Sequence, residues 1–169
     1  YMMGFLNSCV VDTIISALSP TLNYEGGQIA SLPVIFDKDK ASIIEQLVSE
    51  CISISKNEWD AFETSWDFST HPFLLENTSS CCLIREKYNK WERLSDERFA
   101  LLKKNEEKLN QLFIDIYGLE DELSSEETED LVSVRKPDLQ REIKSLISYA
   151  TGCILGRYSL DVPGLVYAG

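Results

Sequence analysis

The sequence lacks any run of roughly 18 uninterrupted apolar residues, the length that a membrane-spanning helix requires. Its apolar N-terminus has no basic leader and no cleavage site of the kind that marks a secretory signal. These absences predict a protein of the cytoplasm with no membrane partner. The chain starts at Tyr1 and stops at Gly169 directly after an apolar stretch, so we expect a piece of a longer protein.

The sequence is poor in residues that are arranged to bind a metal ion. His71 is the one histidine, and the five cysteines show no C-x-x-C spacing. Neighbouring Cys81 and Cys82 point in different directions on a helix or a strand, so they do not easily share a metal ion. We therefore expect reduced thiols and no metal site. His71 precedes a proline in a polar loop without a serine or cysteine arrangement that would mark it as catalytic, which indicates a structural role.

Basic residues are also few, because 16 of them against 28 acidic residues give a formal net charge of −12 at pH 7. This balance argues against a protein that coats nucleic acid non-specifically, since phosphate binding depends on clustered Lys and Arg. The acidic excess is uneven. Residues 58–80 and 119–134 carry five and seven acidic side chains and no base, so the rest of the chain is neutral overall and leaves room for a local DNA-facing surface.

Apolar residues at helical spacing are abundant, and they predict a mainly α fold. We expect helices over residues 2–18, from 37 to about 54, over 82–117 and from Pro137 onward. The stretch 82–117 forms either one long helix or two abutting helices with a break at residues 95–97. Partial alternation predicts one small β element near residues 28–35. The fold class is therefore a helical bundle with long amphipathic helices and that single β element.

The apolar stripes of these helices predict the core. Trp59, Phe62 and Trp66 offer rings that would stack on bases, but their helical spacing and acidic setting favour buried packing. On local chemistry alone, the chain is a helical scaffold or an interaction domain. The expected core residues are Ile44, Leu47, Cys51, Trp59, Trp91, Leu112, Ile116, Ile143, Ile147 and Ile154.

Four stretches of sequence carry a resemblance to a known family. They are LSPTLNYEGGQIASLPVIFDK at 18–38, FETSWDF at 62–68, NEEKLNQLFIDIYGLEDELS at 105–124 and REIKSLISYATGCILGRYSLDVPGLVYAG at 141–169. In order and spacing they resemble the PglX-type adenine-specific DNA methyltransferases of bacteriophage-exclusion (BREX) systems. The last two stretches are the more specific ones. The first is also similar to single-chain type II restriction-modification enzymes and to specificity subunits of multisubunit restriction systems.

The resemblance implies a domain organisation and a reaction for the parent protein. Residues 1–36 resemble the end of a target-recognition domain, and residues 37–169 resemble a helical spacer or scaffold. The parent would transfer a methyl group from S-adenosylmethionine to the exocyclic amine of adenine in double-stranded DNA, after flipping out the base. Double-stranded DNA and other phage-defence proteins would be its partners.

The chain departs from that family in what it lacks. It contains no N-P-P-[YF] tetrapeptide, which would position the adenine amine, and no F-x-G-x-G-type cofactor loop. We therefore expect no catalytic residue and no cofactor in these residues, with S-adenosylmethionine bound elsewhere in the parent. The alternative is a helical protein–protein interaction module with no direct role in DNA modification.

Five residues are candidates for contact with DNA. Thr21, Asn23 and Gln28 supply hydrogen-bonding groups from a polar loop, and Arg141 and Lys144 share a helix face at a spacing of three. The alternative interpretation of the basic pair is a solvated helix face. The other basic residues that give the segment from 135 onward a balance of +2 are Arg135, Lys136 and Arg157.

Overall fold

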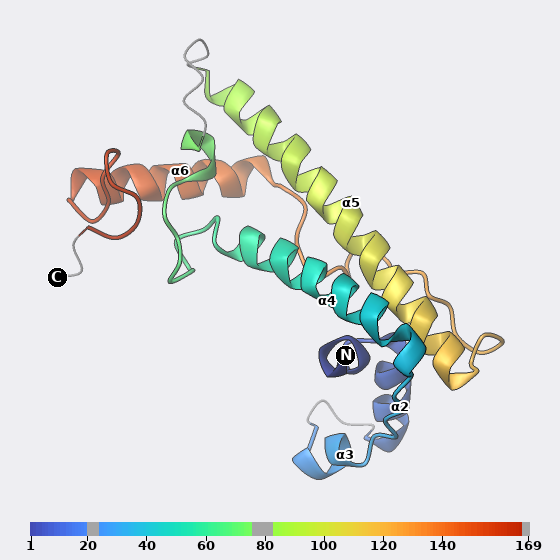
Figure 1. Cartoon of the computed structure of the whole chain (residues 1–169). Coiled ribbons are helices and arrows are strands. Elements are labelled where there is room, and N and C mark those ends of the chain that lie inside the picture. The colour runs from blue at the N-terminus through green and yellow to red at the C-terminus, as the bar shows by residue number, and fades with distance from the viewer. Residues whose placement is uncertain (20–23, 76–82, 167–169) are drawn as a thin grey trace. The chain divides into compact units, whose positions relative to one another are not determined.

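The structure is a computed structural model that describes residues 1–19, 24–75 and 83–166. Helices account for 61% of it, which confirms the mainly α prediction. No helix in the described part of the chain is long and apolar enough to cross a membrane. The elements, shown in Figure 1, are α1 (Met2–Leu6), α2 (Cys9–Leu18), α3 (Gly26–Ala30), α4 (Lys38–Trp59), the 3-10 turn η1 (Pro72–Leu74), α5 (Ile84–Tyr117) and α6 (Leu139–Ile154).

Capping residues set several helix ends. The Asp37 carboxylate accepts two backbone N–H bonds from the first turn of α4, at 2.8 and 3.1 Å. Gly118, directly after α5, has a φ of 65°, the left-handed conformation that ends many helices. The Ser8 hydroxyl accepts the N–H of Val11 at 3.4 Å and caps α2, so residues 2–18 form two helices instead of the one predicted.

The other boundaries correct or settle the remaining helix predictions. α5 continues without interruption through residues 95–97, so the alternative of one long helix is confirmed. α6 begins at Leu139, because the Asp138 carboxylate caps it by accepting the N–H of Arg141 at 2.7 Å. Pro137 therefore precedes the helix and does not open it as expected.

The predicted β element near residues 28–35 is wrong. The first of these residues belong to α3, and the rest form no strand. Tyrosine hydroxyls satisfy the backbone there: Tyr117 donates to the Pro33 carbonyl at 2.5 Å and accepts the Ile35 N–H at 3.0 Å. Tyr1 donates to the Ile35 carbonyl at 3.0 Å. Because side chains bind these backbone groups, the segment needs no strand partner.

The chain divides into two compact units, each made of two separate stretches. Unit 1 comprises Tyr1–Ile52 and Leu101–Val132, and unit 2 comprises Ser53–Ala100 and Ser133–Gly169. The boundaries fall inside α4 and α5, so both long helices contribute residues to each unit.

Unit 1 is built around an apolar core. Its parts of α4 and α5 run antiparallel, since the Asn105 amide donates to Glu50 at 3.1 Å while Lys40 pairs with Asp115 at 3.8 Å. The two helices therefore pack side by side over about three turns. The buried core residues are Phe5, Val10, Val11, Ile15, Leu32, Ile44, Leu47, Leu109, Phe113 and Ile114.

Unit 2 is held by aromatic side chains. Gly152 of α6 lies against the ring of Tyr158, because a Cβ built on this glycine would come within 2.6 Å of the ring. Tyr158 also forms an antiparallel β-bridge with Leu165, the one such bridge among the described residues. The buried clusters are Phe68 with Tyr149 and Tyr158, and Phe73 with Tyr88 and Trp91.

The predicted core is confirmed in part. Ile44, Leu47 and Trp91 are buried. Four more of its members are half-buried against these clusters: Cys51, Leu112, Ile116 and Ile143. The prediction is wrong for Trp59, Ile147 and Ile154, which are 58%, 60% and 84% exposed. For α6 the reason is that the helix turns Glu142, Tyr149 and Gly152 inward. Its apolar stripe therefore meets the buried clusters only along one edge, at residues such as Ile143, and leaves Ile147 and Ile154 in solvent.

Candidate functional site

The candidate DNA-binding residues divide between the two units. Thr21 and Asn23 lie outside the described residues. Gln28, in unit 1, is half-buried in α3, and its side-chain oxygen accepts the backbone N–H of Glu25 at 2.9 Å. This bond closes the first turn of α3, so the side-chain oxygen of Gln28 already has a partner within the helix.

Arg141 and Lys144 both lie on α6 in unit 2, but their surroundings differ. The Arg141 guanidinium bonds to one oxygen of Glu142 through Nη2 at 2.6 Å and through Nε at 3.0 Å. It also donates to the Lys136 carbonyl at 3.2 Å and lies 5.4 Å from the centre of the Phe62 ring. Lys144 is exposed. The charge of Arg141 is therefore engaged within the unit, whereas that of Lys144 faces solvent.

Unit 2 also contains a group of buried polar side chains with atoms that have no hydrogen-bond partner among the described residues. Glu142 is only 1% exposed, and its Oε2 has no hydrogen-bond partner among the described residues. The indole N–H of Trp91 and the hydroxyl of Ser95 are buried in the same unit and have no partner among those residues either. Burial raises the pKa of the Glu58 carboxyl, and the positive charge of Arg141 opposes that shift. Sequence reasoning missed this group, because it assigned charged side chains to solvent-exposed faces.

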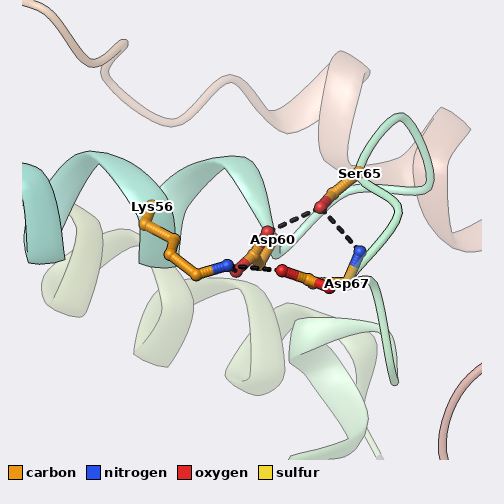
Figure 2. A network of polar contacts seen from close by, with 4 residues as sticks. All are labelled: Lys56, Asp60, Ser65 and Asp67. Atoms are coloured by element: carbon orange, nitrogen blue, oxygen red, sulfur yellow. Dashed lines mark hydrogen bonds and ion pairs between the residues drawn. The ribbon is translucent and has the colours of Figure 1, made fainter.

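A second polar network joins the end of α4 to the turn that follows it, which contains the matched stretch 62–68. Figure 2 shows Lys56 between two carboxylates, with its ammonium 2.7 Å from Asp60 and 2.5 Å from Asp67. The Ser65 hydroxyl donates to Asp60 at 2.5 Å and accepts the backbone N–H of Asp67 at 3.1 Å (Figure 2). Hydrogen bonds from Lys56 and Ser65 lower the pKa of Asp60. The network fixes the turn, so its shape is set by polar side chains.

This turn presents Trp66 to solvent. The Trp66 side chain is fully exposed, and Trp59 is more than half exposed, so the prediction that these two rings are buried is wrong. Phe62 alone of that trio packs inward, with its ring centre 6.5 Å from that of Trp91. The polar residues at 60, 65 and 67 were a usable signal for the turn, but nothing in the spacing of the aromatic residues distinguished inward from outward rings.

His71 lies in the interior of unit 2, at the start of η1. It is fully buried, and its Nδ1 accepts the N–H of Phe73 at 3.3 Å at the start of η1. Burial lowers the pKa of His71 to about 4, so the imidazole is neutral at pH 7. Its ring also meets the Phe73 ring edge-on, with 4.8 Å between the ring centres.

A pocket of about 580 Å³ lies in unit 1, between α1, α2, α3 and residues 126–131. Its apolar lining includes Val11, Ile15 and Leu32, and its acidic lining is Asp12, Glu126 and Glu127. No Lys or Arg lines it, so its charge disfavours a phosphate. Gln28, Arg141 and Lys144 are not among the lining residues. In the described part of the chain, no group of three or more His, Cys, Asp and Glu side chains is placed to hold a metal ion.

Two curated proteins match the chain along almost its whole length. One is the adenine-specific methyltransferase PglX of Lacticaseibacillus casei (strain Zhang), 43% identical over 172 residues, which covers 100% of the chain and 14% of that protein. The other is the adenine-specific methyltransferase BrxX of Escherichia coli O9:H4 (strain HS), 31% identical over 184 residues, with 99% and 14% covered. No family model matches the chain.

These matches bear on the resemblance drawn from the four sequence stretches. The chain spans about 14% of the length of the curated relatives that it matches. Within that span, the alignments extend across both compact units and the four stretches, since they cover 99–100% of the chain. The chain is therefore homologous, along its whole length, to a segment of the PglX-type adenine-specific methyltransferases.

Proposed function

We propose that the chain is a non-catalytic segment of a site-specific adenine DNA methyltransferase of a restriction-modification or phage-defence system, and that it supports recognition of the DNA target. The observation that carries the proposal is the match over the whole chain to two adenine-specific methyltransferases. The lack of an N-P-P-[YF] tetrapeptide in these 169 residues supports a non-catalytic role. Methyltransferases typically use S-adenosylmethionine, which the parent would bind outside this segment.

Within this function, we assign residues 1–36 to the end of a target-recognition domain and residues 37–169 to a helical spacer that orients it. The length of the helices supports the second assignment. α5 has 34 residues without a break, so it extends over roughly 50 Å at the rise of an α-helix. A continuous helix of this length holds attached modules at a fixed separation better than a flexible linker does.

Deletion of residues 105–169 from a full-length methyltransferase that contains this segment tests the proposal. We expect loss of adenine methylation and of binding to target DNA, together with unchanged affinity for S-adenosylmethionine. Retained cofactor binding is the control that the catalytic domain is still folded. If the shortened enzyme methylates its target normally, the segment has no part in recognition. Micromolar binding of S-adenosylmethionine by these 169 residues alone would contradict the non-catalytic assignment.

For direct DNA contact, we propose Lys144, together with Thr21, Asn23 and Gln28, as groups that face the phosphate backbone. Arg141 is a weaker candidate for DNA contact, because its guanidinium is bonded to Glu142. Of the two basic residues predicted to share a face of α6, only Lys144 therefore offers an exposed charge that is not engaged in an ion pair among the described residues. This ammonium would add affinity without choosing a sequence, since phosphate contacts position a protein and do not read bases.

Charge reversal at Lys144 tests this contact in the full-length enzyme. The Lys144→Glu variant should bind every DNA sequence several-fold more weakly and lower the slope of log affinity against log salt by about one. Reversal at Arg141 is less informative, because it would place two carboxylates side by side at residues 141 and 142. Lys104→Glu, at an exposed position of α5, is the matched control. If the Lys144 and Lys104 variants behave alike, Lys144 belongs to a solvated face.

A second candidate function is a helical protein–protein interaction module. It is favoured by the large apolar side chains on the surface, of which the fully exposed Trp66 is the clearest. Such side chains mark contact sites when they gather on one surface. The deletion of residues 105–169 separates the two candidates, since a pure interaction module would leave DNA methylation by the purified enzyme intact.

A further inference from the structure

Three large apolar side chains of α6 face outward. Leu139, Ile147 and Ile154 are 53%, 60% and 84% exposed. They follow one another at intervals of eight and seven residues, which places all three within an arc of about 80° on an α-helix. The exposed Ala150 falls inside the same arc, as does Ile143, which is half-buried against the cluster of Phe73, Tyr88 and Trp91. The arc contains no charged side chain. An apolar face of this kind normally packs against the interior of its own protein.

The inward face of α6 is fixed by specific contacts. Glu142, Tyr149 and Gly152 are its buried residues. Arg141 lies 5.4 Å from the centre of the Phe62 ring, and Gly152 allows the ring of Tyr158 to approach closer than any side chain would permit. Rotation of the helix to bury Ile147 and Ile154 would break these two contacts and expose Tyr149 instead. The outward orientation of the stripe therefore follows from how the inward face is built.

Exposed apolar side chains continue in the segment after α6. Leu155 and Leu160 are both 76% exposed, and Val162, Leu165 and Val166 are each more than half exposed. Single exposed apolar residues are common on soluble proteins, but a stripe extended by a neighbouring segment is typical of a surface that another structure covers. We expect the covering surface to be mainly apolar, because apolar side chains prevail on this surface, although Arg157 and Asp161 of the same segment are also exposed.

We propose that the stripe of Leu139, Ile147 and Ile154 docks onto an apolar surface of the same methyltransferase polypeptide, outside these 169 residues. The proposal rests on the proposed function, in which the chain is a segment of a longer enzyme. Its relatives support this occupant, because the matched segment is 14% of each protein and most of the polypeptide is covalently linked to it. A covalently linked surface has a high effective concentration and is the favoured occupant over a separate molecule.

Site-specific photo-cross-linking in the full-length enzyme tests the docking. The variant Ile147→p-benzoylphenylalanine carries the cross-linker within the stripe. The matched control is the same substitution at Ser148, which is exposed and points 100° away from the stripe. We expect irradiation of the first variant to give intramolecular cross-links to peptides outside this segment, at several times the yield of the control. Mass spectrometry of the digested enzyme identifies the joined peptides.

Every other outcome overturns the docking. A cross-linked species of twice the mass would show a second copy on the stripe, and a link to another protein would show a separate partner. A link to residues within this chain, or a yield equal to that of the control, would show that the rest of the enzyme does not cover it. The cross-link does not depend on methylation, so this result stands apart from the deletion experiment.

Stability of the full-length enzyme provides a second measurement. The double variant Ile147→Lys with Ile154→Lys should lower its melting temperature by several degrees, since lysine in a docked apolar face loses solvation. Ser148→Lys should leave the melting temperature within about one degree. Equal melting temperatures for the double variant and the control would contradict the docking even if no cross-linked peptide were recovered.

Discussion

The two compact units differ in how they treat buried polar groups. In unit 1, the buried Asn110 is fully engaged: its oxygen accepts the N–H of Cys9 at 2.9 Å, and its nitrogen donates to Glu127 at 2.6 Å. In unit 2, four buried polar atoms have no hydrogen-bond partner among the described residues. They belong to His71, Trp91, Ser95 and Glu142. The buried amide of Asn110 in unit 1 thus has hydrogen-bond partners, whereas these four buried polar atoms of unit 2 have none among the described residues.

The same contrast holds for the apolar side chains. The core of unit 1 draws on the stripes that the sequence predicts, with Ile44 and Leu47 from α4 packed against Phe113 from α5. In unit 2, α6 buries Glu142 and exposes Ile154. Local pattern and packing agree in the first unit and conflict in the second. Conflicts of this kind are expected where a surface serves binding, because the missing partner would complete the packing.

The largest effect that we predict concerns the core of unit 1. Phe113 is fully buried, and its ring lies 5.8 Å from Phe5 and 5.6 Å from Tyr1 between ring centres. Phe113→Ala should lower the free energy of unfolding by about 3–5 kcal/mol, measured by chemical denaturation, because it removes a large side chain and leaves a cavity. Leu101→Ala, at a half-exposed position of the same helix, is the control and should cost under about 1 kcal/mol. Similar losses would mean that unit 1 has no tight core.

How far the sequence predicts the structure follows the same division. The helical period located α4 and α5 and the unit 1 core residues Ile44 and Leu47, because those stripes are buried where the pattern places them. It failed at residues 28–35, since the hydroxyls of Tyr1 and Tyr117 come from distant parts of the chain. It failed again for the buried face of α6, where Tyr149 and Gly152 pack against Tyr158 and leave Ile147 and Ile154 exposed.

The candidate site was less predictable than the fold. Lys144 is exposed, as a DNA-facing residue must be, but the engagement of Arg141 by Glu142 could not be foreseen. Adjacent residues on a helix project about 100° apart, so their spacing gives no reason to expect an ion pair. The polar network of Lys56 with Asp60 and Asp67 was equally hidden, because Asp67 lies beyond the end of α4. The family, by contrast, was recognisable from four short stretches.

The second prediction uses pH to test the buried polar groups of unit 2. The pKa of His71 is lowered to about 4 in the folded state, from an ordinary value near 6.5. Between these values only the unfolded chain binds the proton, so stability falls as pH decreases from about 6.5 to 4. The loss is at most about 3 kcal/mol. Denaturation at pH 7.5 and pH 4.5 measures it.

The variant His71→Asn isolates this contribution. It removes the titrating group while keeping a polar side chain beside the Phe73 N–H. The many carboxylates titrate equally in both proteins and cancel in the comparison. We expect the variant to lose less stability than the parent between the two pH values. An identical pH dependence would show that the imidazole is solvated in the folded protein.

The third prediction tests whether unit 2 depends on its ion pair. Glu142→Gln keeps the size of the side chain but removes its charge, so the two hydrogen bonds from Arg141 lose their ion-pair character and weaken. We expect a loss of about 2 kcal/mol in the free energy of unfolding. Lys144→Gln, two positions along α6, should change it by less than about 0.5 kcal/mol. If the two variants matched, the buried position of Glu142 would be in doubt.

The smallest effect is expected at the turn after α4. The network of Lys56, Asp60, Ser65 and Asp67 holds this turn without using the side chain of Trp66, which is fully exposed. Trp66→Ala should therefore change the free energy of unfolding by less than about 0.5 kcal/mol, while it removes the tryptophan most accessible to acrylamide. Trp91→Ala, in the buried cluster of the same unit, is the contrasting variant and should cost about 3–5 kcal/mol. A loss above about 1 kcal/mol for Trp66→Ala would mean that this ring packs against the protein and is not exposed to solvent.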